Sequence, residues 1–436
     1  MQLGVALSKG RGGVAASLLT ATCTLLGSAP HVAMAEEEPK LWEFDTALLY
    51  YSESDGRVRD ASGSVMVRRN LRGGGLVSFG LTIDSLTGAS PSGALRTSGA
   101  QTFTSPSGNA LYTTPAGDIP LDPSFLDTRI ALTANWRMKP SRWSTFEVGA
   151  SASSEYDYVH LGANARYAHD FSQRNRTISI GLSVALDSID PEGGAPIPLA
   201  AMLPPGDLSN RLGTDDKTVI DVLVGYSHVF GRRTVGQFNY SFTRSSGYLN
   251  DPYKIVSVLD ADTGDLVLGE GGFGTYLFES RPDSRTQHGL YAEVRHARSG
   301  GDIVGGSYRF VTDDWGIRSH TLDARYRWFV DQGWYLQPHL RYYTQSAADF
   351  YALYLADNES VPIHASADYR LAEFDAFTYG AKIGFRPGGS GDEWSLRLEY
   401  YTQSGVSPPA RGPGLPAGDD LIPSVDALIV QAGYSF

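Results

Sequence analysis

Polar and apolar residues alternate along most of the chain with a period of two, which is the spacing of side chains on the two faces of a β-strand. Within residues 321–330, Asp323 and Arg325 fall on one side of the expected strand. Leu322 and Tyr326 fall on the other side. This alternation predicts strands whose two faces meet different environments.

About sixteen segments show this pattern. Most are about 10 to 14 residues long, enough to cross a bilayer when tilted, whereas strands of soluble proteins are nearer about 5 or 6 residues. The pattern therefore predicts an all-β fold, a transmembrane antiparallel up-and-down β-barrel with an apolar outer face and a polar lumen. The segments are 42–52, 64–71, 75–85, 127–138, 144–155, 158–170, 176–188, 216–230, 234–248, 286–298, 302–313, 318–330, 334–346, 371–386, 393–403 and 423–436.

The lengths of the connections alternate as well. Bacterial outer-membrane barrels have short periplasmic turns and longer extracellular loops. If the first strand runs outward, every second connection is short, as at 72–74, 139–141 and 231–233. The long connections, such as 249–285 and 347–370, all fall on the opposite, extracellular side. A soluble β-sandwich gives no reason for this sorting.

Aromatic residues support the same prediction. Six of the seven tryptophans lie beside predicted periplasmic turns, as expected for the aromatic belt of a membrane interface, and only Trp315 lies elsewhere. The final strand is apolar on one face and includes Tyr434 and the C-terminal Phe436. Such an ending is similar to the assembly signal that the barrel-assembly machinery reads, so we expect that machinery to be a partner. The belt tryptophans are Trp42, Trp136, Trp143, Trp328, Trp334 and Trp394.

Residues 1–35 have the form of a cleavable secretory signal. Lys9 and Arg11 supply the positive start, an apolar stretch follows, and Ala33-Met34-Ala35 offers small residues for signal peptidase. We therefore expect cleavage after Ala35 and a single outer-membrane barrel domain, residues 36–436, in a Gram-negative bacterium. Outer-membrane lipid and lipopolysaccharide are its expected surroundings.

Composition narrows the chemistry of the mature chain. The only cysteine, Cys23, lies inside the predicted signal, which excludes disulfides and cysteine-ligated metal sites after cleavage. The net charge of −12 becomes −14 without Lys9 and Arg11. Such an acidic chain argues against a nucleic-acid partner, whose phosphates need compensating cations.

Five segments resemble one group of outer-membrane proteins, the domain-of-unknown-function family DUF3570. They are spread in order over most of the mature chain, and the resemblance implies a bacterial outer-membrane barrel. Members are often encoded near periplasmic redox or flavin-transfer proteins, which implies a role in an envelope redox system as one alternative. The segments are Asp84 to Gly93, Ser154 to Tyr158, Gly247 to Lys254, Arg281 to Arg285 and Thr312 to Gly316.

Charged residues occupy the predicted inner face of neighbouring strands between the tenth and the fifteenth. One interpretation is an ion-pair network that braces the wall. The other is a charged constriction that selects solutes, as rings of side chains do in channels. The two can coexist, and the sequence leaves both open. These lumen-lining candidates are Glu293, Arg295, Asp323, Arg325, Arg327, Arg341, Arg397 and Glu399.

Other motifs give weaker signals. Asp260, Asp262 and Asp265 have the alternate spacing of a calcium loop but depart from the EF-hand pattern, so a plain hairpin turn is the main interpretation. No histidine lies in a recognisable nucleophile motif, and His288 and His296 fall on the lipid-facing side of their strand. We therefore expect neither an enzyme nor a cofactor.

The sequence leaves three hypotheses for function, the third of which is an outer-membrane hydrolase. The first is a porin-like channel or transport component for small solutes, since about sixteen strands enclose a lumen wide enough for water. In that case the loop from Ser85 to Leu126 is the main candidate to constrict the lumen. The second is a non-conducting envelope scaffold that anchors a periplasmic partner protein.

Overall fold

The computed structural model describes residues 41–436 apart from several short gaps. The predicted signal segment, with Cys23, therefore lies outside the described residues, as do parts of the loops. The gaps are 55–56, 89–90, 105–110, 122–125, 192, 204–206, 208, 270–273, 332, 388–390, 407–421 and 423.

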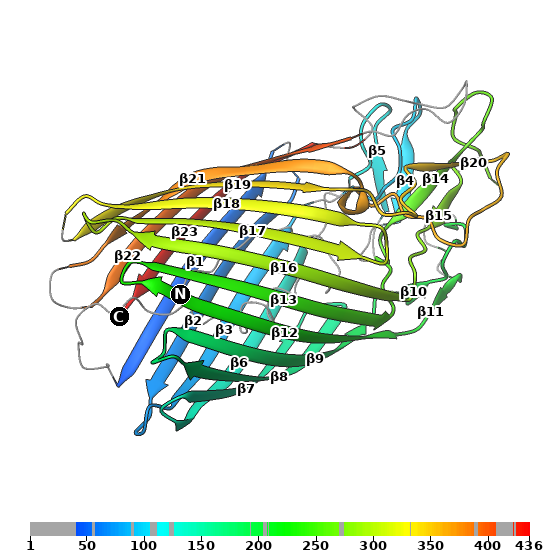
Figure 1. Cartoon of the computed structure of the whole chain (residues 1–436). Coiled ribbons are helices and arrows are strands. Elements are labelled where there is room, and N and C mark those ends of the chain that lie inside the picture. Colours follow the sequence, from blue (N-terminus) through cyan, green and yellow to red (C-terminus); the bar gives the residue numbers. More distant parts are fainter. Residues whose placement is uncertain are drawn as a thin grey trace.

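Sixteen strands form one closed barrel in which each strand is antiparallel to its neighbours, as predicted (Figure 1). Strand order in the wall follows chain order, so the topology is up-and-down. The strands are β1 (Trp42–Glu53), β2 (Arg59–Asn70), β3 (Leu76–Thr87), β6 (Leu126–Ser141), β7 (Ser144–Ser154), β8 (Tyr158–Phe171), β9 (Arg176–Ile189), β12 (Asp215–Gly231), β13 (Thr234–Gly247), β16 (Ser284–Ala297), β17 (Ile303–Asp313), β18 (Arg318–Phe329), β19 (Trp334–Gln345), β21 (Phe374–Phe385), β22 (Glu393–Gly405) and β23 (Val425–Ser435).

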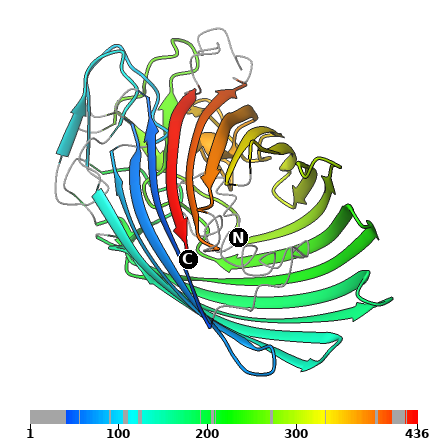
Figure 2. The ribbon, with the colours of Figure 1, turned by 90° about the vertical axis from the view of Figure 1, so that its left-hand side faces the viewer.

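The last strand closes the barrel against the first. In Figure 2, where the end opposite the small strands faces the viewer, the red β23 lies beside the blue β1. Beyond β23, Phe436 and Phe44 exchange two backbone hydrogen bonds of 2.9 Å. Their rings stack with centroids 4.9 Å apart, and Tyr434 stacks on Phe436 at 5.0 Å. The residues of the predicted assembly signal therefore lie at the seam of the barrel.

The two faces of the wall differ as the alternation requires. Large apolar side chains such as Leu48, Leu340 and Leu398 are exposed on the outside, where a soluble protein would bury them. Five of the predicted belt tryptophans are among these exposed residues, and Trp143 is half-buried. Trp315 is buried at the other end of the barrel. Lipid contact explains an outer surface of this composition.

Connections at the two ends of the wall differ in length, also as predicted. Turns such as 142–143 and 232–233 join strands at one end, which we call the short-turn end. The described residues of the loops 88–121, 190–214, 248–283 and 346–373 all lie at the other, the long-loop end. No helix within the described residues has the length and hydropathy that a membrane-spanning helix requires.

The long loops fold together into a structure that we call the cap, formed by the described residues of 88–121, 190–214, 248–283 and 346–373. In its central sheet, β14 pairs antiparallel with β15 and parallel with β20, so two different loops share one sheet. The small elements are β4 (Gln101–Thr104), β5 (Leu111–Thr114), β10 (Ala195–Pro196), β11 (Arg211–Leu212), β14 (Ile255–Leu259), β15 (Tyr276–Phe278), β20 (Tyr354–Ala356) and the 3-10 helix η2 (Tyr369–Leu371).

The cap has its own apolar core and spans the mouth of the barrel. Leu95, Leu259 and Leu353 come from three different loops and pack in one buried cluster. The backbone N–H of Ile255 donates to the carbonyl of Ser92 at 2.9 Å. The loop of Ser92 follows the third strand of the wall, whereas the loop of Ile255 follows the ninth. Since six of sixteen strands separate them around the wall, their contact bridges the opening.

Candidate functional site

All eight charged residues predicted to line the lumen lie on strand faces opposite the exposed apolar side chains. On β22, Leu396 and Leu398 are more than half exposed, whereas Arg397 and Glu399 are 8% and 5% exposed. The candidates on β18 and β19 follow the same alternation with Leu322 and Leu340. The structure brings five of the eight into one network on β18, β19 and β22, and Arg327 lies beside it. Glu293 and Arg295 form a separate pair on β16, with Nε and Oε1 2.6 Å apart.

His339 connects the two acidic centres of this network. Its Nε2 lies 2.8 Å from the carboxylate of Asp323, and its Nδ1 lies 2.8 Å from the carboxylate of Glu399. Arg325 and Arg341 both bind Asp323, at 3.1 and 3.0 Å. The wall therefore holds Arg325 and Arg341 in fixed positions on β18 and β19.

Gly380 makes the bridge from His339 to Glu399 possible. Strand β21 runs between β19 and β22, and Gly380 is paired with His339 on one side and with Glu399 on the other. A Cβ atom on Gly380 would stand 2.1 Å from the carbonyl oxygen of Leu398. Sequence reasoning missed His339, although a glycine facing the lumen between two polar strands was the available signal.

A second bridge crosses β21 nearer the short-turn end. Tyr335 is 1% exposed, lies over Gly384 and donates from its hydroxyl to Glu393 on β22 at 2.5 Å. Arg327 stacks on the ring of Tyr335 and donates to the neutral side chain of Gln337 at 2.8 Å. Sequence reasoning missed Tyr335 and Glu393, because nothing along the chain indicates a contact between strands that are not neighbours.

The wall from β16 to β22 has a surplus of positive charge. Its inward-facing positions hold eight arginines and lysines and five carboxylates among the described residues. Arg397 is weakly paired: it is 8% exposed, and the carboxylate of Glu399 lies 3.7 Å from its Nη1. The Nε of Arg397 is buried without a hydrogen-bond partner in the described part of the chain. Arg325 and Arg341 lie within electrostatic range. This arrangement suits a small anion.

The cap contains a second group of charged residues, which is buried. Asp251, Glu279, Arg281, Asp368 and Arg370 come from two loops and form what we call the cap cluster. Arg281 bridges Glu279 at 2.7 Å and Asp368 at 2.8 Å. Arg370 bridges Asp368 and also Asp251, the latter at 2.7 Å. These contacts fasten loop 346–373 to loop 248–283.

Burial and neighbouring charges act differently on the two deepest acids of the cap cluster. Burial alone would raise the pKa of Asp368, but Arg370 and Lys254 hold that pKa well below its usual range. Burial raises the pKa of Glu279 above its usual value, although Arg281 opposes the shift. Asp368 is therefore held ionised, whereas Glu279 is biased toward its protonated form.

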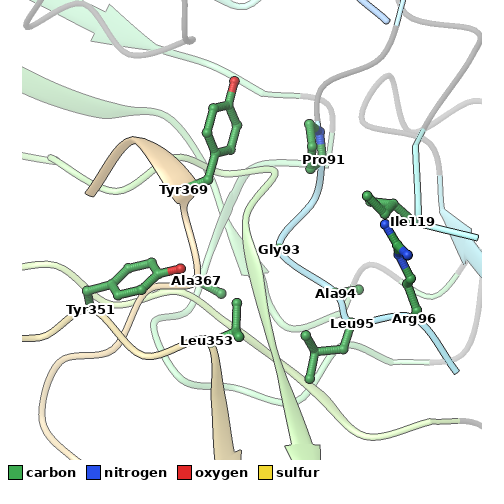
Figure 3. A pocket seen from close by; sticks show the side chains of 10 residues that line it. All are labelled: Pro91, Gly93, Ala94, Leu95, Arg96, Ile119, Tyr351, Leu353, Ala367 and Tyr369. Atoms are coloured by element: carbon green, nitrogen blue, oxygen red, sulfur yellow. The ribbon is translucent and has the colours of Figure 1, made fainter. Parts of the chain in front are cut away.

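One cleft within the described part of the cap is too small to be a solute site. It lies between loop 88–121 and loop 346–373, with Arg96, Tyr351 and Tyr369 among its lining residues (Figure 3). Its volume of about 40 Å³ has room for only a few water molecules. The loop predicted to constrict the lumen thus forms part of the cap rather than a separate element.

The remaining sequence candidates lie apart from these groups. The Asp260 carboxylate accepts the backbone N–H groups of Asp262 and Thr263 at 3.0 and 2.8 Å, as in a turn. Asp265 does not join these acids in a ligand-sized group; within the described ranges, the acids close enough to share a metal ion are Asp127, Glu155 and Asp157. His288 and His296 are exposed on the outer face.

The family resemblance falls on the long-loop end. Trp315 donates from its indole to the carbonyl of Ser284, and Tyr253 donates to Asp157. Lys254 donates to the carbonyl of Pro91. These contacts join the five segments that carry the resemblance, so the resemblance concerns the rim of the barrel and the cap.

A family model described as "Protein of unknown function (DUF3570)" matches residues 15–436. Among curated proteins, none matches the chain. A solved mutant of the ferric enterobactin receptor from Pseudomonas aeruginosa, in complex with enterobactin, is 12% identical, with a TM-score of 0.41. The match covers 88% of this chain but only 58% of the receptor.

Two further solved structures are similar at the same low level. A bacterial polysaccharide outer membrane secretin is 11% identical, with a TM-score of 0.44 and coverage of 92% of this chain and 99% of the secretin. A mutant of the monoaromatic hydrocarbon channel TodX is 10% identical, with a TM-score of 0.39 and coverage of 91% and 90%. These likenesses assign no activity to the chain.

Proposed function

The chain belongs to the DUF3570 family of proteins of unknown function, and we propose that it is a porin-like channel or transport component for small solutes in the outer membrane. The observation that carries this proposal is the contrast between the two faces of the wall. The outer face is apolar, whereas polar and charged side chains line the inside of a barrel of sixteen strands. Barrels of this size enclose an aqueous channel when nothing fills them.

The preferred solutes are small anions such as carboxylates and phosphates. The positive surplus of the β16–β22 wall and the underpaired guanidinium of Arg397 both favour negative charge. Arginine suits these anions because its planar donors match their oxygens in pairs. A local potential of one kT beside the β16–β22 wall, on the order of those at charged clefts, would raise the ratio of chloride to potassium there about sevenfold.

The cap limits passage at the long-loop end. Because its loops bridge the mouth and are fastened by buried ion pairs, we expect brief openings rather than a constantly open pore. Local opening of this kind is typical of loops that gate ligand access.

Recording from the purified protein in planar bilayers tests the proposal. We expect discrete conductance steps and a reversal potential in a KCl gradient that shows preference for chloride. Arg397→Gln should lower this preference, whereas Arg318→Gln, which removes a charge from the outer face of β18, should leave it unchanged. A protein that conducts neither as wild type nor after the cap is loosened by Asp368→Asn would contradict the channel.

The bridged mouth itself favours a second candidate function. A barrel that stays closed suits a non-conducting scaffold that anchors a periplasmic partner, including a component of an envelope redox system. This second function would be supported over the first if such a partner co-purifies with the barrel and the Asp368→Asn variant shows no conductance in planar bilayers.

A further inference from the structure

Ser151, His160 and Asp187 lie on the inner face of three adjacent strands, β7, β8 and β9. The Oγ of Ser151 lies 3.1 Å from the Nε2 of His160. The Nδ1 of His160 lies 2.7 Å from the Oδ1 of Asp187. We propose that this trio is a nucleophile site for acyl transfer from small esters that enter the lumen, an activity beyond the proposed transport function.

The order of the contacts assigns a role to each side chain. A carboxylate on Nδ1 selects the imidazole tautomer that is protonated there, which leaves the lone pair of Nε2 facing the serine. His160 is then placed as the general base for Ser151. This is the geometry of nucleophile, base and orienting acid that activates a serine hydroxyl.

The burial of the three residues follows the same order. The Asp187 side chain is fully buried, the His160 side chain is 12% exposed, and Ser151 is half-buried. Lys217 contacts the second oxygen of Asp187 at 3.0 Å, so both oxygens of the carboxylate are fixed. Asp187 therefore acts through His160 as a positioning residue, while the two groups that would meet a substrate are the accessible ones.

Two glycines allow the side chains around the nucleophile to pack closely. Gly162 is paired with Ser151 across the strands, and a Cβ on Gly162 would stand 2.5 Å from the Ser151 Oγ. Gly149 precedes Ser151 on the same face, and the side-chain oxygen of Asn135 and the amide nitrogen of Asn164 lie 2.1 and 2.7 Å from the point where its Cβ would stand. Asn164 is paired with Gly149 across the strands, and we assign its amide as the donor for the developing oxyanion.

The reaction balances without any further reactant except water. The Ser151 Oγ attacks the ester carbonyl carbon while its proton passes to the His160 Nε2. The carbon–oxygen bond to the alcohol breaks, and the leaving oxygen takes that proton. Water then attacks the acyl-serine, His160 accepts its proton and returns one to the Ser151 Oγ, and a carboxylic acid leaves. No residue of the charged β16–β22 wall takes part.

No histidine lies in a nucleophile motif, so the sequence alone predicts no enzyme. The trio escapes such a search because the serine and the aspartate lie 9 and 27 positions from the histidine, on separate strands. Only the register of the wall brings the three side chains together.

Labelling with a small fluorophosphonate probe tests the proposal on the full-length protein in detergent. We expect the probe to modify Ser151, as identified by peptide mass spectrometry. Ser151→Ala should abolish labelling, and His160→Gln should slow it at least about 100-fold, the usual contribution of a general base. Ser153→Ala is the matched control, since Ser153 is on the same face of β7 and paired with His160, and should label like the wild type.

Two further readouts keep the result decisive. Heat-modifiable migration on gels confirms that each variant forms a barrel. Ser153→Cys, in a mature chain without cysteine, should react with a small water-soluble thiol reagent and so report access to the site. An unlabelled Ser151, labelling that His160→Gln does not slow, or a position 153 that the reagent cannot reach would each overturn the proposal. None of these outcomes depends on conductance, so a failure of the acyl-transfer proposal would leave the channel proposal untouched.

Discussion

Asp368 and Glu279 are carboxylates of the same cap cluster, yet the structure predicts a large effect when Asp368 is replaced by its amide and a small one when Glu279 is. Asp368 is 1% exposed and pairs with both Arg281 and Arg370. Asp368→Asn leaves these buried guanidiniums underpaired, and breaking a buried ion pair on one side costs about 3–5 kcal/mol. The cap should therefore open far more often, while the wall keeps its stability.

Glu279→Gln has the shape of protonated glutamic acid, the form that burial already favours at this position. We expect it to change the stability of the cap by at most about 1 kcal/mol, the scale of one neutral hydrogen bond. The pair of variants thus separates a carboxylate that must be ionised from one that tolerates neutrality.

The two pKa shifts also predict how the cap responds to pH. The lowered pKa of Asp368 adds stability that is present above its usual value of 3.8 and lost only at much lower pH. The raised pKa of Glu279 adds stability that is present below 4.5 and lost as the pH rises through the raised value. Acidification from neutral pH toward 4.5 should therefore stabilise the wild-type cap but not the cap of Glu279→Gln.

Hydrogen exchange followed by mass spectrometry measures both effects. Ser280 and Ala365 exchange backbone hydrogen bonds of 2.8 and 2.9 Å across the two loops, so their amides report cap opening. A loss of about 3–5 kcal/mol corresponds to exchange roughly 150- to 4,000-fold faster in Asp368→Asn. Peptides from the barrel strands serve as the internal control. Equal acceleration in both variants, or none in Asp368→Asn, would refute the reasoning.

Three further predictions concern the wall. Gly384→Ala places a Cβ 2.1 Å from the buried Tyr335 ring and should lower the free energy of unfolding in urea by about 1–3 kcal/mol. Gly305→Ala, with its nearest contact at 3.6 Å, should change it by less than about 0.5 kcal/mol. Leu398→Arg should lower the free energy of unfolding in lipid vesicles by about 2–4 kcal/mol, because the residue faces hydrocarbon. An equal loss for Ser395→Arg, at a position that faces the lumen, would contradict this orientation of the strand. Deletion of Phe436 should reduce the folded fraction in isolated outer membranes, seen by gel migration, and an unchanged yield would argue against its role at the seam.

The barrel could be predicted from the sequence because lipid and lumen act on every residue of a strand. Arg397 and Leu398 are neighbours in the chain but meet opposite environments, so the alternation is visible without any partner strand. The largest boundary error is at β2, which begins at Arg59 rather than at 64, because the outward-facing residues there, Arg59, Ala61 and Gly63, are not large apolar side chains. Loop lengths then gave the orientation of the strands relative to one another.

The cap and the contacts inside the lumen could not be predicted, because they depend on positions far apart in the chain. Lys254 and Pro91 meet across 163 positions, and loop sequences carry no periodic signal that would pair them. The bridge from His339 to Glu399 needs the register of three strands and the missing side chain of Gly380. The sequence indicated which charged residues face the lumen, but not which residues they pair with.

Scanning β22 with single cysteines tests the central claim most directly, since the only native cysteine is in the predicted signal. Labels at 394, 396, 398 and 400 should be quenched by agents dissolved in the lipid phase. Cysteines at 395, 397 and 399 should instead react with water-soluble reagents. Strict alternation over these seven positions is the predicted result; uniform reactivity, or lipid contact at position 397, would contradict a barrel with hydrocarbon outside and water within.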